Sequence, residues 1–211
     1  MKLTADKITS HLKKGLAPVY FITGDESLLV GETMDAIRSA AREQGFSERE
    51  THAADARFDW ATLRDGLDNL SLFAEKKLVE VQLATASPGR EGAKALVAWL
   101  EDPPPDTVLV VQAPKVDKRG SSTKWAQTLQ NDGVWVTVYS VPPERLTGWL
   151  SQRFAKAGLE CEQGAVEALA ARVEGNLLAA QQEISKLALL MPGKTITAEV
   201  VVQGVTDGAR L

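Results

Sequence analysis

The chain has 211 residues, of which 44% are hydrophobic and 25% are charged, a globular composition that excludes disordered, collagen-like and disulfide-scaffold classes. Its net charge of −4 and its pI near 5.3 exclude an overall basic field that would attract nucleic acid. Cys161 is the only cysteine, so no intramolecular disulfide forms. The polar residues after Met1 contain no signal-peptide core, and no apolar run is long enough to cross a membrane, which predicts a soluble, cytoplasmic protein.

The first 141 residues alternate predicted strands and predicted helices. LAPVYFITG, at 16–24, is apolar, β-branched and closed by glycine, as in a strand buried on both faces, and a helix follows as far as Gly45. The remaining expected strands are 50–54, 77–83, 107–113 and 134–140, and the expected helices are 60–70, 93–102 and 121–130. This alternation predicts an α/β domain with a mainly parallel sheet of about five strands and helices on both faces.

A second domain is expected over 142–211, because Pro142 and Pro143 mark the end of the strand pattern. The amphipathic helices expected there are 145–157, 163–173 and 176–190, followed by a short helix opened by Thr197. Together they predict a small helical bundle. The last residues show no helix stop, so we expect the sequence to be truncated.

The glycine at the end of the first strand occupies the position where a nucleotide-binding loop holds phosphate. A functional P-loop reads G-x-x-x-x-G-K-[ST], but the frame from Gly24 places Leu29 and Val30 where the second glycine and the lysine belong. A frame from Gly31 fails as well, because Glu32 and Thr33 follow it. The sequence therefore predicts a degenerate P-loop that binds no nucleotide.

Other catalytic patterns are absent from the sequence. The strands that end in VQLATA and VVQAPK carry no Asp-Glu pair for magnesium at their C-terminal ends, although Glu80 lies inside the first and Asp117 lies beyond the second. His11 and His52 have no metal-ligand spacing and are expected at the surface, and the carboxylates beside Cys161 disfavour its thiolate. We expect no catalytic residue, no metal and no cofactor.

A short apolar segment, Asn69 to Phe73 (NLSLF), stands at the end of a predicted helix, before charged residues. Leu72 and Phe73 are adjacent large apolar residues that do not easily face one core together. Either they are core residues that close the helix end, or they form an exposed plug that enters a partner's pocket. Burial of both in such a pocket yields roughly 3–6 kcal/mol before the costs of association.

Five ordered segments carry a family resemblance: VYFITGDESLL, FDW, LSLFAEKKLVEV, PPDTVLVV and EGNLLAAQQEISKLALL. They resemble the delta subunit family of bacterial DNA polymerase III, the clamp-opening subunit of the clamp loader, from about Leu16 to Arg210. The resemblance implies an AAA+-like α/β domain (1–141) with a degenerate P-loop at Gly24, Leu29, Val30 and Gly31, followed by a helical lid domain (142–211). It also implies that the chain neither binds nor hydrolyses ATP.

The resemblance assigns the contact with the sliding clamp, the beta subunit, to a Leu-Phe pair that falls on Leu72 and Phe73. Leu70 and Ser71 also match the clamp-binding peptide Q-L-[SD]-L-F, whereas Asn69 replaces its glutamine. The implied function is to bind the clamp and open its ring for loading onto primed DNA during replication, within the bacterial replisome.

Further partners are implied only for the assembled loader. They are the motor subunits, the delta-prime subunit and primed DNA. Full-length members continue into a collar domain that this sequence does not contain, and no Ser-Arg-Cys tripeptide supplies an arginine finger. We find no polymerase site, although the family belongs to a holoenzyme that is a DNA-directed DNA polymerase, a nucleotidyltransferase.

Two alternative functions stay open at the level of sequence. An active AAA+-type nucleotidase agrees with the strand-glycine-helix start but not with the missing lysine and Asp-Glu pair. A non-catalytic α/β interaction scaffold would bury Leu72 and Phe73 in its own core. Separately, the basic residues Lys115, Lys118, Arg119 and Lys124 suit either a solvated loop, which we favour, or a contact with DNA phosphates in the loader.

Overall fold

The structure is a computed structural model that describes residues 1–63 and 76–203. Contacts divide the chain into two compact units, Met1–Ser140 and Val141–Leu211.

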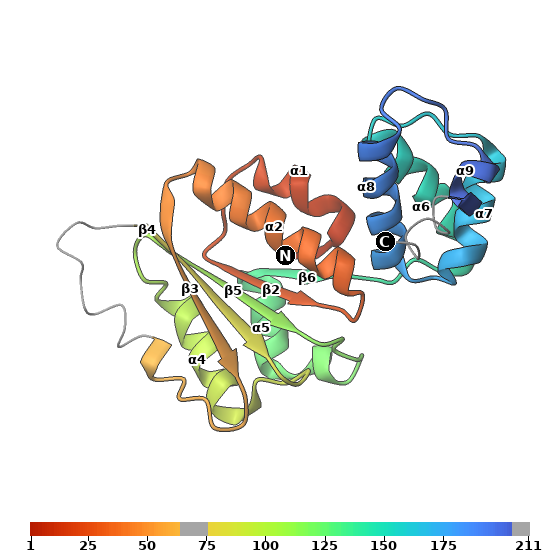
Figure 1. The fold of residues 1–211 in the computed structure, drawn as a ribbon. Coiled ribbons are helices and arrows are strands. Elements are labelled where there is room, and N and C mark those ends of the chain that lie inside the picture. Colours follow the sequence, from red (N-terminus) through yellow and green to blue (C-terminus); the bar gives the residue numbers. More distant parts are fainter. Residues whose placement is uncertain (64–75, 204–211) are drawn as a thin grey trace. The chain divides into compact units, whose positions relative to one another are not determined.

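The first unit contains a parallel six-stranded sheet in the order β1-β6-β2-β5-β4-β3 (Figure 1). Its strands are β1 (Lys2–Thr4), β2 (Val19–Thr23), β3 (Phe46–Ala54), β4 (Lys76–Leu83), β5 (Thr107–Ala113) and β6 (Val134–Thr137). The expected count of five was one short, because β1 has three polar or half-buried residues and carries no strand pattern. The parallel sheet itself is confirmed.

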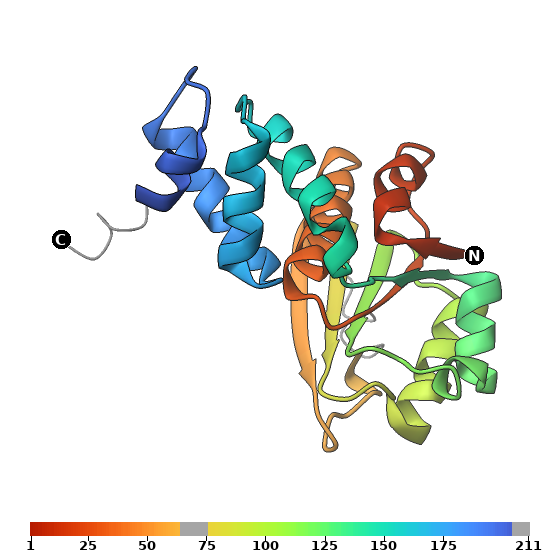
Figure 2. The same ribbon diagram turned by 90° about the vertical axis from the view of Figure 1, so that its right-hand side faces the viewer.

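Helices cover both faces of this sheet, as Figures 1 and 2 show. On one face lie α1 (Ile8–Leu12) and α2 (Ser27–Glu43), and on the other lie α4 (Gly89–Glu101) and α5 (Lys124–Asp132). Two single-turn 3-10 helices, η1 (Ala5–Lys7) and η2 (Gly120–Ser122), complete the unit. Because the central strands are covered twice, every residue of β2 is buried.

Helix α2 illustrates how the sequence builds these layers. Val30, Met34 and Ile37 recur at helical spacing and are at most 4% exposed, so they form one buried stripe against the sheet. Burial of each large apolar side chain stabilises the fold by about 1.5–3 kcal/mol. Gly45 follows with a φ of +87°, a conformation that L side chains rarely adopt, and lets the chain turn into β3.

Strand β3 forms one edge of the sheet and is longer than the expected 50–54. Its first eight residues alternate between half-buried and exposed, and the exposed side includes Arg49 and Thr51. Polar and charged residues along an exposed edge disfavour pairing with another chain. Because the first half of the strand is polar, its sequence contains no apolar run that would predict a strand.

The second unit contains four described helices, α6 (Pro143–Lys156), α7 (Gln163–Val173), α8 (Leu177–Leu190) and α9 (Ala198–Gln203). Leu150, Phe154, Leu169 and Ile184 are fully buried and make the core between α6, α7 and α8. Pro143 begins α6, where its missing N–H costs nothing. Within the described ranges, no helix is long and apolar enough to span a membrane.

Candidate functional site

The apolar segment that the sequence singles out lies outside the described residues. Leu70, Ser71, Leu72 and Phe73 all fall within 64–75. The structure describes the residues on either side of this interval, which end at Leu63 and resume at Lys76.

On the N-terminal side, the chain approaches the interval through an aromatic pair. Phe58 and Trp60 stack edge to face with ring centroids 5.1 Å apart. Trp60 lies so close to Gly92 of α4 that a Cβ there would be 2.5 Å from the indole ring, so no larger residue fits at position 92 without a shift. Leu63, the last described residue on this side, is 4% exposed and joins the same core.

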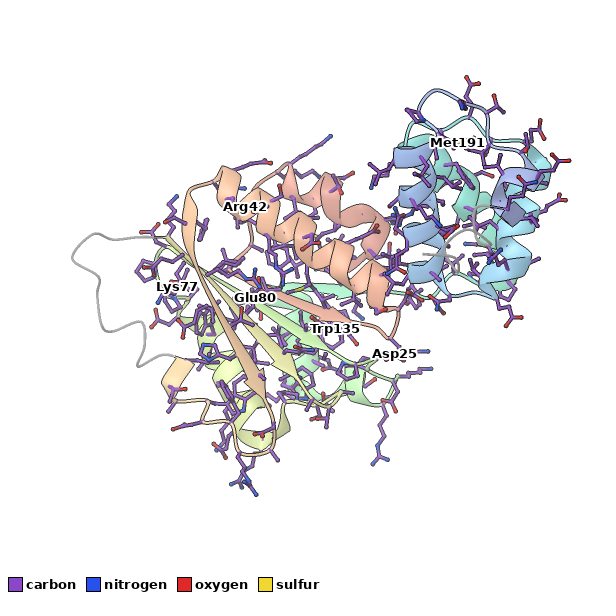
Figure 3. All side chains as sticks on the ribbon, viewed as in Figure 1. Asp25, Arg42, Lys77, Glu80, Trp135 and Met191 are labelled. Carbon is purple, nitrogen blue, oxygen red and sulfur yellow. The ribbon has the colours of Figure 1, made fainter. Side chains whose placement is uncertain are left out.

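On the C-terminal side, two lysines fix the start of β4. Lys76 Nζ donates to the carbonyl oxygen of Gln44 at 3.2 Å and lies 5.4 Å from the ring centroid of Phe46. Lys77, labelled in Figure 3, places its Nζ 3.3 Å from Glu50 Oε2, and its backbone N–H donates to Asp106 at 2.8 Å. Both borders of the interval are therefore fixed, one to α4 and the other to β3 and the chain before β5.

The loop that the sequence predicts to be a degenerate P-loop begins at Gly24, directly after β2. A Cβ at this position would stand 2.5 Å from the carbonyl oxygen of Val138, and the Gly24 N–H donates to Ala113 at 3.3 Å. The glycine is thus required by the close approach of neighbouring chain segments. No phosphate needs to be invoked to explain it.

The two acidic side chains of this loop both accept hydrogen bonds from backbone N–H groups. Glu26 is the N-cap of α2, and its carboxylate accepts the Leu28 N–H at 3.3 Å. Asp25, labelled in Figure 3, accepts the Lys115 N–H at 2.9 Å and so ties the loop after β2 to the chain after β5. The Glu26 carboxylate thus satisfies one of the backbone donors at the N-terminus of α2, and both carboxylates repel phosphate.

The other residues of the expected loop belong to the helix and its core. Val30 is 4% exposed in the core and Leu29 packs against it, while Gly31 faces open space. Gly24, Val30, Gly31 and Arg38 help to line a hollow of about 360 Å³ at the C-terminal ends of β4 and β5. Arg38 is the only cation among its described lining residues, and carboxylates already bind it.

Glu80 is the buried carboxylate of this sheet and explains what holds Arg38. Glu80 is labelled in Figure 3. Arg38 donates from Nε and Nη2 to the two oxygens of Glu80 at 2.8 and 2.7 Å, and Arg49 Nε lies 3.0 Å from Glu80 Oε1. The hydrogen bonds to Glu80 are the main cause that raises the pKa of Arg38. The Glu80 carboxylate is therefore engaged by two arginines and is not arranged as a metal ligand.

Both histidines also have structural partners. His11 Nε2 lies 3.2 Å from the Tyr20 hydroxyl, and His52 Nε2 lies 2.7 Å from Glu50, so both histidines are half-buried rather than at the open surface. Burial raises the pKa of the Cys161 thiol. Among the described residues, no group of three or more histidines, cysteines or carboxylates is placed to hold a metal.

The parallel sheet, the strand-glycine-helix start and the separate helical unit define an AAA+-like protein. The solved Bacillus subtilis DNA clamp loader delta protein has a similar fold, with a TM-score of 0.70 and 22% identity over 94% of this chain and 61% of that chain. A Thermotoga maritima RuvB Holliday junction branch migration motor is more distant, with a TM-score of 0.52 and 14% identity over 94% of this chain and 66% of that one.

The family follows from the sequence comparison. The family model described as DNA polymerase III, delta subunit, matches residues 20–139, and the chain belongs to this family. It is 31% identical over 212 residues to the delta subunit of Escherichia coli and 28% identical over 213 residues to that of Haemophilus influenzae. These alignments cover 99% of this chain but 61% of each relative, so the chain spans less than two thirds of their length.

Proposed function

We propose that this chain binds the sliding clamp of the bacterial DNA polymerase III replisome and favours the opened ring for loading onto primed DNA. Membership of the delta subunit family carries this proposal, because the family model matches the unit that contains the candidate clamp contact. We assign that contact to the α/β domain, 1–141, and a lid role to the helical domain, 142–211.

The contact residues in this proposal are Leu70, Ser71, Leu72 and Phe73. The fixed borders at Leu63 and Lys76 support this assignment, because a segment held at both ends loses less entropy on binding than a free tail. Leu72 and Phe73 supply the apolar anchor. Their burial in a clamp pocket yields roughly 3–6 kcal/mol before the costs of association.

The opening step is differential binding. A ligand shifts a conformational equilibrium only by its difference in affinity for the two states, so the chain must bind the sprung clamp interface better than the closed one. In this proposal the motor subunits supply ATP hydrolysis and, together with the delta-prime subunit, complete the loader. The contacts of Asp25 and Glu26 at the P-loop support the assignment of ATP chemistry to other subunits.

The test measures binding of the chain to its cognate clamp in the absence of DNA. Leu72→Ala combined with Phe73→Ala should abolish binding while the unfolding transition stays in place. The matched control is Leu189→Ala combined with Leu190→Ala, which removes two exposed apolar side chains, 83% and 62% exposed, from the helical unit. The control should bind as the unmodified chain does.

Two results would overturn the assignment. Unchanged binding by the Leu72 and Phe73 variant would show that the contact lies elsewhere. Loss of its folded structure would show that the pair belongs to the core, as a non-catalytic α/β scaffold requires.

A further inference from the structure

Two glutamine side chains stand next to each other in the hollow of about 360 Å³ at the C-terminal ends of β4 and β5. Gln82 and Gln112 are register partners on these parallel strands, which run about 4.8 Å apart, so the two side chains leave the same face of the sheet. That face is covered by α2, because Glu80, two residues before Gln82, contacts Arg38. We call these two glutamines the amide pair.

The side chains of the amide pair form no hydrogen bond with any residue that the structure describes. Gln82 is exposed and Gln112 is half-buried, and both line the hollow. Each amide offers one oxygen acceptor and two N–H donors. Gln130 of the same unit, by contrast, donates from Nε2 to the Ser121 carbonyl oxygen at 2.9 Å. The amide pair therefore presents adjacent polar atoms that are available to a ligand.

The charges around the hollow favour a cation as that ligand. Arg38 is the only cation among the described lining residues, and two carboxylates, Glu80 and Asp35, bind it at 2.7–2.8 Å. Asp25, labelled in Figure 3, also lines the hollow, and it accepts the backbone N–H of Lys115 rather than a charged group. The hollow thus has one uncompensated negative charge near the oxygens of the amide pair.

The other walls of the hollow are apolar. They are formed by Val30 and Met34 of α2, by Leu83 of β4 and by Pro114. Gly31 leaves room beside α2, because no atom lies within 4 Å of an added Cβ. Apolar walls beside polar acceptors suit a long side chain that has an apolar stem and a charged end.

The chemistry of these groups separates the possible ligands. A phosphate or a carboxylate would be repelled by Asp25. A neutral amide would pair with the glutamines but would gain nothing from the carboxylate. An ammonium group is a compact, strongly hydrated point charge, whereas a guanidinium group is planar and weakly hydrated and carries five donors in a fixed fork. A guanidinium group can therefore donate to both amide oxygens and lie beside the carboxylate.

We infer that this hollow binds the guanidinium group of an arginine side chain presented by a protein partner, with the oxygens of Gln82 and Gln112 as acceptors and Asp25 as the counter-charge. A protein-borne arginine fits better than free arginine, because Asp25 repels the α-carboxylate of the free amino acid. A cation site thus occupies the place where a nucleotide-binding loop would hold phosphate. The inference goes beyond the proposed clamp contact and does not depend on it.

The probe for this site is N-acetyl-arginine amide, which carries the side chain without a charged backbone. NMR spectra of the whole, isotope-labelled chain follow the side-chain N–H signals of the amide pair. The probe should shift both signals saturably, with a dissociation constant of about 1–10 mM, as expected for one small side chain. N-acetyl-citrulline amide has the same shape but no charge and should bind at least about fivefold more weakly. Free arginine should bind no more tightly than the probe.

Removal of the amide pair tests the acceptors. Gln82→Leu combined with Gln112→Leu should weaken binding at least about tenfold, measured from the backbone signal of Gly31 at the hollow. The matched control is Gln152→Leu combined with Gln182→Leu, which removes two exposed amides from the second unit and should change the affinity less than about twofold. An unchanged unfolding transition checks the fold of each variant.

Asp25→Asn tests the counter-charge. Asparagine still accepts the Lys115 N–H, so the loop stays tied while the charge is lost. This variant should bind the probe about three- to fivefold more weakly at low salt, and added salt should weaken the unmodified chain more than the variant. Asp55→Asn is the matched control, because Asp55 is exposed and accepts the Arg57 N–H at 2.8 Å. The control should leave the affinity unchanged.

The inference is overturned by an absence of saturable shifts in both amide signals, by equal affinity for the arginine and citrulline probes, or by inorganic phosphate that shifts the same signals and competes with the probe. Tighter binding of free arginine than of the probe would assign the hollow to the free amino acid instead of a protein partner. The comparison of clamp binding by the Leu72 and Phe73 variant is unaffected by any of these results, so the two proposals fail independently.

Discussion

Arg38 and Glu80 join α2 to the middle of β4 through a two-pronged contact, with Arg38 Nε and Nη2 at 2.8 and 2.7 Å from the two carboxylate oxygens. Glu80 is 3% exposed, so its charge is tolerated only because two cations compensate it. Arg49 adds the second cation from β3 at 3.0 Å. The network therefore joins the edge strand β3 to β4 and to α2.

Glu80→Gln should destabilise the protein by about 3 kcal/mol, because it leaves Arg38 without its main partner in a partly buried site. The measurement is the free energy of unfolding of the first unit's transition in urea. Asp35→Asn is the matched control, because Asp35 contacts the same guanidinium at 2.7 Å but is 72% exposed, and it should change stability by less than about 1 kcal/mol. Equal effects from the two variants would show that burial of Glu80 is not what makes its contact important.

Gly24→Ala should destabilise the first unit by about 1–3 kcal/mol, because the new methyl group meets the Val138 carbonyl oxygen at 2.5 Å. Gly31→Ala is the matched control within α2. No atom lies within 4 Å of its added Cβ, so it should stabilise the helix by about 0.5–1 kcal/mol. Thermal unfolding of both variants checks the pair, and a neutral Gly24→Ala would mean that the loop and β6 separate easily.

The sequence predicts the parts of this fold that rest on apolar patterns. β2 and β5 are continuous apolar runs in the sequence, and they are wholly or almost wholly buried in the structure. The apolar residues of α2 recur at helical spacing in the sequence and form its buried stripe. β1 and α1 escaped prediction because three and five residues are too few to show a period. Long-range pairs such as Arg38 with Glu80 cannot be predicted from one sequence, because the sequence does not indicate which distant cation contacts a buried carboxylate.

The candidate site likewise has features that the sequence predicts and features that only the structure shows. The missing lysine of the P-loop is visible by counting from Gly24, but the reason for the glycine itself, its approach to Val138, needs the sheet order. The tie between Asp25 and Lys115 likewise joins residues 90 positions apart. Leu72 and Phe73 remain a sequence-based prediction, because they lie outside the described residues.

His11 should contribute a pH-dependent part of the stability. Burial, with Lys14 nearby, lowers the pKa of His11 from its ordinary value of 6.5. The folded state therefore binds fewer protons than the unfolded state, so this contribution is complete above about pH 6.5 and is lost as the pH falls through the folded pKa. A neutral ring fits the site, because the Tyr20 hydroxyl accepts the Ala17 N–H at 3.0 Å and can donate its own proton to an unprotonated His11 Nε2 at 3.2 Å.

The measurement compares unfolding midpoints of the unmodified chain and of His11→Gln at pH 5 to 8. The unmodified chain should exceed the variant most at pH 7.5 and by clearly less near pH 5. A difference that stays constant over this range would show that His11 does not titrate differently in the folded and unfolded states.

Magnesium and ATP should leave the thermal midpoint of this chain unchanged. A ligand that binds only the folded state at 100 times its dissociation constant stabilises it by about 2.7 kcal/mol, which moves the midpoint by several degrees. We expect no such shift, because Val30 occupies the lysine position, Glu26 caps α2 and Arg38 is bound by carboxylates. Magnesium chloride at equal ionic strength is the reference for salt effects. A shift that saturates with ATP and exceeds this reference would instead favour an active AAA+-type nucleotidase, and it would require the P-loop carboxylates at Asp25 and Glu26 to leave their backbone partners.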